Sequence, residues 1–176
     1  MSLSRRHWVL AGVAATFAAL GGWVAVRRYA PEDGSADALA LLMAQSMPDH
    51  AGQPFAMSSL RGRVLVLNFW ATWCSPCVEE MPELAELHRE ISPGNGAVVG
   101  IGIDSAQNIA EFARKTPYPY PLLVAGVGGI ELARGFGNRI GALPFTVLVS
   151  AQGQIVGRTM GRIRLTEIRE RVRTLL

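Results

Sequence analysis

Residues 68–77 read Asn-Phe-Trp-Ala-Thr-Trp-Cys-Ser-Pro-Cys and contain the only two cysteines of the chain. The apolar run 64–67 leads into this stretch, and a Glu-rich segment with helical spacing follows it. This order predicts a buried strand, a tight turn with both thiols, and a helix that begins near Cys74. Unpaired backbone N–H groups and the positive end of the helix dipole favour a thiolate at such a position. We therefore predict a redox centre that alternates between a dithiol and a disulfide.

Two other roles for the cysteine pair are weaker. A structural disulfide between Cys74 and Cys77 would close a very short loop, for which the chain-entropy relation gives only about 2 kcal/mol. A closed zinc site needs four ligands, and neither His50 nor His88 has a spacing that completes one with this pair. We expect no resident metal and no cofactor, because no flavin or nicotinamide motif is visible either. Metal or copper handling remains an alternative to redox chemistry.

An uncharged run of nineteen residues, 8–26, lies near the N-terminus. As a helix it would be about 28 Å long, close to the roughly 30 Å of a bilayer's hydrocarbon core. Trp8 and Trp23 stand near its two ends, where interfacial aromatic residues belong, and arginine pairs flank it. Residues 1–30 are therefore predicted to be a signal or membrane-anchor segment.

The export route and the fate of this segment stay open. Residues 4–10, Ser-Arg-Arg-His-Trp-Val-Leu, resemble a twin-arginine signal but depart from its pattern at positions 8, 9 and 10, so an ordinary positive leader is the alternative. Residues 36–38, Ala-Asp-Ala, have the form of a cleavage site but lie ten residues beyond the apolar run. That distance favours a retained anchor over a cleaved signal.

The net charge of +3 belongs mainly to the N-terminal segment. Residues 1–30 carry four Arg and no acid, so the rest of the chain has 13 basic against 14 acidic residues, or −1. A nearly neutral domain gives no reason to expect nucleic-acid binding.

The rest of the chain reads as a linker, residues 31–43, followed by one α/β domain, residues 44–176. Turn-forming residues around short apolar pieces in 46–63 predict a β-hairpin before the core. The predicted buried strands at 64–71 and 97–103, with the predicted helix at 74–91 between them, indicate a right-handed βαβ unit. The predicted elements are strands at 64–71 and 97–103, helices at 74–91, 106–115 and 130–137, a hairpin at 147–160, and a last helix capped by Thr166.

This order of elements, with Trp-Cys-x-x-Cys after the first core strand, resembles the thioredoxin fold. Residues 68–82, Asn-Phe-Trp-Ala-Thr-Trp-Cys-Ser-Pro-Cys-Val-Glu-Glu-Met-Pro, look like the membrane-tethered bacterial thiol:disulfide reductases of the TlpA type, relatives of the cytochrome c maturation thioredoxins. The Gly-x-x-Pro-x-Thr at 141–146 is similar too. The resemblance implies a central mixed sheet flanked by helices, with an N-terminal β-hairpin extension and an N-terminal signal or anchor helix. It also implies a periplasmic domain, anchored in the inner membrane through residues 8–26.

The resemblance also implies roles for single residues. Cys74 would be the exposed attacking thiolate and Cys77 the buried resolving thiol. Pro144 matches the cis-proline that faces the dithiol in this fold, and the backbone of Leu143 would pair with a substrate peptide by strand addition. The expected substrate-binding residues are Trp73, Ser75, Pro76 and Leu143.

Glu80 is the candidate proton acceptor. Cytosolic thioredoxins have a buried Asp where this chain has Asn68, so that acceptor is missing. Glu80 lies one helical turn beyond Cys77 and can neighbour the dithiol. A partly buried carboxylate there would have a raised pKa and could take a proton from Cys77. The alternative is a solvated acid of the first helical turn, favoured by the dipole.

These inferences predict a reductase that works by thiol–disulfide exchange on protein substrates with disulfides, and that is re-reduced by an upstream membrane dithiol protein. A reductase specific for cytochrome c maturation is one alternative, and a copper-delivery protein is another, although such proteins usually have Cys-x-x-x-Cys. A peroxidase would need Thr-x-x-Cys, whereas Thr72 is only two positions before Cys74. A disulfide-introducing oxidant would need a large helical insertion, for which the domain has no room.

Overall fold

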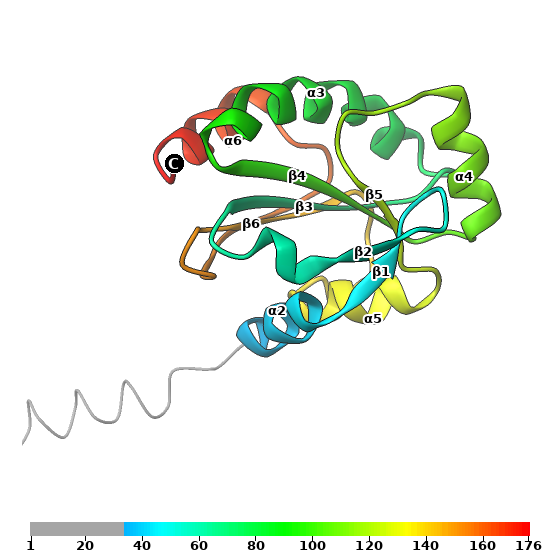
Figure 1. Ribbon diagram of the computed structural model, residues 1–176, viewed down its shortest axis with the longest axis horizontal. Helices are drawn as coiled ribbons and strands as arrows, with labels where there is room; N and C mark the ends of the chain where they lie inside the picture. The colour runs from blue at the N-terminus through cyan, green and yellow to red at the C-terminus, as the bar shows by residue number, and fades with distance from the viewer. Residues whose placement is uncertain (1–33) are drawn as a thin grey trace, which may run out of the picture. The chain divides into compact units, whose positions relative to one another are not determined.

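A five-stranded sheet forms the centre of the computed structural model, which describes residues 34–176 (Figure 1). The strand order is β5-β4-β3-β6-β7. Strands β3, β4 and β5 are parallel to one another, whereas β6 runs antiparallel to β3, and β7 runs antiparallel to β6. The predicted mixed sheet is therefore confirmed. The strands are β3 (Val64–Trp70), β4 (Gly96–Gly102), β5 (Leu122–Val124), β6 (Phe145–Val149) and β7 (Ile155–Met160).

Helices cover both faces of this sheet (Figure 1). All seven residues of β3 are buried, and they alternate between the faces, as expected for a strand covered on both sides. Leu65, Leu67 and Phe69 pack on the face covered by α2 and α5, whereas Val66 and Trp70 pack on the face covered by α3, α4 and α6. The helices are α2 (Ser35–Ala44), α3 (Ser75–Ile91), α4 (Ala106–Lys115), α5 (Gly128–Gly135) and α6 (Leu165–Arg173).

Between α2 and β3, the chain forms a short pair of antiparallel strands. It consists of β1 (Ser46–Pro48) and β2 (Pro54–Ala56) and is followed by the 3₁₀ helix η1 (Met57–Leu60). Asp49 stabilises the connecting turn, because its Oδ1 accepts hydrogen bonds of 2.8 Å from two backbone N–H groups of the turn. The same turn is joined to β5, since the N–H of His50 donates to the carbonyl of Leu122 at 2.9 Å.

Helix α2 occupies most of the segment predicted to be a linker, residues 31–43. Its residues Leu39 and Leu42 are buried in the core cluster shared with α5 and η1. Arg61 also donates a hydrogen bond to the carbonyl of Met43 at 3.2 Å. The folded unit therefore starts before residue 44, because this Ala- and Leu-rich segment presents an apolar stripe to the sheet.

Three further points of the sequence analysis differ in outcome. Strand β5 was not predicted, because three residues after the proline-rich segment 116–121 are too few to show a periodic pattern. Thr166 was wrongly predicted as a cap: α6 begins one residue earlier, and Arg164 is its N-cap. The signal or anchor at 1–30 lies outside the described residues. Within residues 34–176, no helix is both long and apolar enough to cross a bilayer.

The burial of α2 leads to a testable difference between two adjacent leucines. Leu42→Ala removes a fully buried side chain and is expected to lower the free energy of unfolding by about 2–5 kcal/mol. Leu41, 64% exposed on the same helix, is the matched control, and Leu41→Ala should change stability by less than about 0.5 kcal/mol. Urea denaturation of both variants measures the difference. Similar losses in the two variants would mean that α2 does not belong to the core.

Candidate active site

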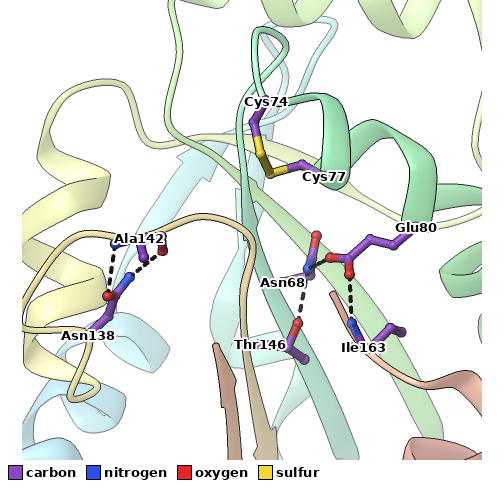
Figure 2. Close-up of a disulfide and its surroundings, with 8 residues drawn as sticks. All are labelled: Asn68, Cys74, Cys77, Glu80, Asn138, Ala142, Thr146 and Ile163. Carbon is purple, nitrogen blue, oxygen red and sulfur yellow. Dashed lines mark hydrogen bonds between the residues drawn. A yellow bond between two sulfur atoms is a disulfide. The ribbon is translucent and has the colours of Figure 1, made fainter. Parts of the chain in front are cut away.

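The two cysteines lie where β3 ends and α3 begins (Figure 2). Cys74 is the N-cap of α3, as the sequence predicts, and Cys77 lies in the first turn. They form a disulfide with a Cα–Cα distance of 5.3 Å. The N–H of Cys77 donates to the carbonyl of Cys74 at 3.0 Å, so the first turn of the helix holds the two residues together.

The two sulfur-bearing residues differ in exposure less than the sequence suggests. Cys74, expected to be exposed, is only 6% exposed, and Cys77 is 0% exposed. Both belong to the apolar cluster beneath α3, against which Leu143 packs. Cys74 is thus the more accessible of the two, but in the disulfide form it is largely covered. The neighbouring Trp73 is 70% exposed and borders the site from the solvent side.

The loop before Cys74 is held to the end of β4. The N–H of Ile103 donates to the carbonyl of Trp70 at 2.7 Å, and the hydroxyl of Thr72 donates to a carboxylate oxygen of Asp104. Trp70 itself is fully buried in the core. These contacts fix the turn that carries the thiols relative to the sheet.

A second loop contributes the cis-proline. The Leu143–Pro144 peptide bond is cis, as the family resemblance implies. Buried Asn138 braces this loop, because its side chain donates to the carbonyl of Ala142 at 2.8 Å and accepts from the N–H of Ala142 at 3.1 Å (Figure 2). The N–H of Gly161 donates to the carbonyl of Pro144 at 2.8 Å. Asn138 was not predicted, because a single Asn in a loop carries no sequence pattern.

Glu80 is completely buried, which excludes the alternative of a solvated acid. Its Oε1 accepts a hydrogen bond of 2.7 Å from the side-chain amide of Asn68, and its Oε2 accepts one of 2.9 Å from the N–H of Ile163. Burial raises the pKa of Glu80 above its ordinary value, although these two hydrogen bonds oppose the rise. Figure 2 shows the carboxylate turned toward Asn68 and Ile163.

Asn68 and Thr146 complete this buried polar group. They face each other on the paired strands β3 and β6, and the amide of Asn68 donates to the hydroxyl of Thr146 at 3.0 Å. Thr146 was predicted only as part of a motif, and Ile163 was not predicted. The motif Gly-x-x-Pro-x-Thr was therefore the available signal for Thr146.

Metal ligands are not gathered in the part of the chain that the structure describes. Residues 34–176 contain no group of three or more His, Cys, Asp or Glu side chains that could hold an ion. His50 is exposed in the β1–β2 turn. In His88, Nδ1 accepts a hydrogen bond of 3.2 Å from the N–H of Val98, and burial lowers the pKa of the imidazole.

The raised pKa of Glu80 predicts a specific pH dependence of stability. The folded state holds the Glu80 proton more tightly than the unfolded state, so this stabilisation is present below the unfolded pKa and is lost as the pH rises through the folded pKa. As the pH falls from about 8 to about 5, wild type should therefore gain stability relative to Glu80→Gln. Urea denaturation of the oxidised proteins measures this difference.

The control variant is Glu79→Gln, which removes an exposed carboxylate that pairs with Arg162 at 2.9 Å. It keeps Glu80 and should keep the wild-type pH trend. A difference between wild type and Glu80→Gln that does not change with pH would contradict the raised pKa.

Comparisons with known proteins agree with this geometry. The model of the AhpC/TSA family matches residues 41–158. The thiol-disulfide oxidoreductase ResA of Geobacillus thermodenitrificans is 25% identical over 130 residues, which cover 73% of this chain and 72% of that protein. Among solved structures, a thiol:disulfide interchange protein of the thioredoxin family from Chlorobium tepidum has a TM-score of 0.67 at 25% identity, covering 74% of this chain and 92% of that one. MTB dsbF has a TM-score of 0.64 at 27% identity, with coverages of 77% and 97%.

The family match spans more than half of the chain and includes both cysteines. The chain therefore belongs to the AhpC/TSA family, and with similar proteins named for thiol–disulfide exchange and a disulfide of its own at a helix start it is a thiol–disulfide oxidoreductase.

Proposed function

We propose that this protein reduces disulfide bonds of partner proteins outside the cytosol. The observation that carries the proposal is the Cys74–Cys77 disulfide at the start of α3, above the buried carboxyl of Glu80 and in the apolar cluster against which Leu143 packs. A disulfide that closes so short a loop contributes little to folding stability, about 2 kcal/mol by the chain-entropy relation, so a redox role explains it better than a structural one.

The reaction proceeds by two exchanges of sulfur partners. In the dithiol form, the Cys74 thiolate attacks one sulfur of the partner's disulfide and releases the other sulfur, which takes up a proton. The Cys77 sulfur, after losing its proton, then attacks the Cys74 sulfur and releases the second sulfur of the partner. The partner gains two electrons and two protons in total, and the Cys74–Cys77 disulfide closes.

Position and accessibility favour Cys74 as the attacking residue. It is the N-cap of α3, where the helix dipole stabilises a thiolate, and it is the more exposed of the two cysteines. Cys77 is fully buried, and its sulfur is bonded to that of Cys74. These features support the roles of nucleophile and resolving thiol, respectively.

The surface around Cys74 suits an extended peptide. Trp73 is among the most exposed large apolar side chains of the described residues, and Ser75 and Pro76 are exposed beside the disulfide. The backbone of Leu143 precedes Pro144 and offers a place for strand addition by the partner. These residues form the proposed substrate-binding surface.

Glu80 is the proposed proton acceptor for the resolving step. Its raised pKa brings the carboxyl closer to the range in which it exchanges a proton with a thiol near neutral pH. In the disulfide form both oxygens of the Glu80 carboxylate accept hydrogen bonds, one from Asn68 and one from Ile163. The proposed proton transfer from Cys77 to Glu80 therefore crosses the buried layer and does not use a direct hydrogen bond between the two.

The catalytic cycle needs an external source of electrons. An upstream membrane dithiol protein would re-reduce the Cys74–Cys77 disulfide, and residues 8–26 would anchor the chain in the inner membrane with the domain in the periplasm. The apolar run between arginine pairs supports this placement. Apocytochrome c and copper-site assembly proteins are candidate partners whose disulfides this protein would reduce.

Replacing each cysteine tests the assigned roles. Cys74→Ser should reduce a protein disulfide no faster than the uncatalysed background, because the nucleophile is lost. Cys77→Ala should accumulate a mixed disulfide on Cys74, which non-reducing electrophoresis detects and mass spectrometry identifies. Lys115→Ala, at an exposed position of α4, is the control and should retain wild-type rates. Wild-type turnover by Cys74→Ser would overturn the mechanism.

The direction of the reaction has its own measurement. Equilibration with glutathione should give a reduction potential closer to roughly −270 mV, as in reducing thioredoxins, than to roughly −120 mV, as in strong oxidants. A value near the oxidising end would reverse the proposed direction of electron flow.

A further inference from the structure

Asn68 is a fully buried amide in an otherwise apolar layer. The alternation along β3 places it on the same face as Val66 and Trp70, beneath α3. Both hydrogens of its side-chain nitrogen are used, one toward Glu80 Oε1 at 2.7 Å and one toward Thr146 Oγ1 at 3.0 Å. Because a carboxylate only accepts hydrogen bonds, the nitrogen of the amide faces Glu80, and this fixes the position of the oxygen.

The oxygen of the same amide has no hydrogen-bond partner. Asn68 Oδ1 is one of the few buried side-chain polar atoms in residues 34–176 without one. Figure 2 shows this oxygen turned toward α3, on the side of the Cys74–Cys77 disulfide, with Cys77 the nearer of the two cysteines in the view. A buried acceptor without a donor is destabilising and rare in native proteins. A disulfide cannot supply the donor, but a thiol can.

We propose that Asn68 is a positioning residue of the redox site, whose Oδ1 accepts a hydrogen bond from the Cys77 thiol when the disulfide is reduced. This inference rests on the proposed function, since it requires the disulfide to open. Two glutathione thiols supply two electrons and two protons, the Cys74–Cys77 bond breaks, and glutathione disulfide forms. The Cys77 sulfur then carries a proton at a buried position where no donor existed before.

This hydrogen bond has two consequences. It holds the proton on Cys77 while Cys74 ionises at the helix start, which separates the resolving thiol from the nucleophile. It also stabilises only the dithiol form, because the oxygen is unpaired in the disulfide form. Glu80, which accepts from the nitrogen of the same amide, polarises Asn68 and strengthens its oxygen as an acceptor.

The infrared S–H stretch of Cys77 tests the hydrogen bond directly. In a Cys74→Ala background Cys77 is the only thiol, and its band disappears on deuteration. Adding Asn68→Leu should shift this band to higher frequency, because the acceptor is lost. Adding Asn68→Asp, which keeps an acceptor oxygen, should leave the band at low frequency, and this variant serves if Asn68→Leu does not fold.

Thr146→Val is the matched control, because it removes a partner of the Asn68 nitrogen and leaves the oxygen in place. Its S–H band should stay at the position seen with Asn68 intact. Two outcomes would overturn the inference. One is an S–H band that Asn68→Leu leaves unchanged, and the other is a band at the frequency of a free thiol both with Asn68 intact and in Asn68→Asp.

The equilibrium constant for reduction by glutathione is the second readout. Asn68→Leu should lower it about three- to tenfold, because the reduced form loses a hydrogen bond and the oxidised form loses an unpaired acceptor. Thr146→Val should change it less than about twofold, since this bond exists without the thiol. An unchanged constant in Asn68→Leu, with wild type reduced normally, overturns this inference alone. A wild-type disulfide that glutathione and dithiothreitol cannot reduce overturns the proposed function and the inference together.

Discussion

The complete burial of β3 is the constraint on which the rest of the structure depends. Because both faces of this strand are covered, each of its side chains must fit one of two packed layers. Alternation sends Phe69 to one layer and Trp70 to the other, and it forces Asn68 into the layer beneath α3. The strand ends where α3 begins, so the same element that organises the core also places Cys74 at the helix start.

The buried polar group below the disulfide is costly and therefore informative. A carboxyl without water is destabilised in its charged form, and two hydrogen-bond donors only partly offset this cost. Asn68 and Ile163 supply those donors from β3 and from the segment before α6. An apolar side chain at position 80 would pack in this layer without that cost, and this contrast supports the proton-acceptor role proposed for Glu80.

Sequence patterns predicted the local parts of the site well. The run 64–67, the Cys-x-x-Cys spacing and the following helical periodicity led to the strand, the turn and the helix where the structure has them. The parts that were missed lack a local signal. Strand β5 is three residues long, and the sequence of the linker 31–43 is compatible with a helix at 37–43 but does not show that its leucines pack against α5 and η1. Asn138 acts only through the loop that it braces.

The sequence by itself determined that two thiols stand at the start of a helix after a buried strand, because hydrophobic periodicity and Cys spacing act over a few neighbouring residues. Only the tertiary structure decided what surrounds them. Glu80 meets Ile163 across 83 positions of the chain, and Asn68 meets Thr146 across 78. Burial and hydrogen bonding of this kind set the pKa of a carboxyl, and they arise from contacts between strands and helices that no local pattern encodes.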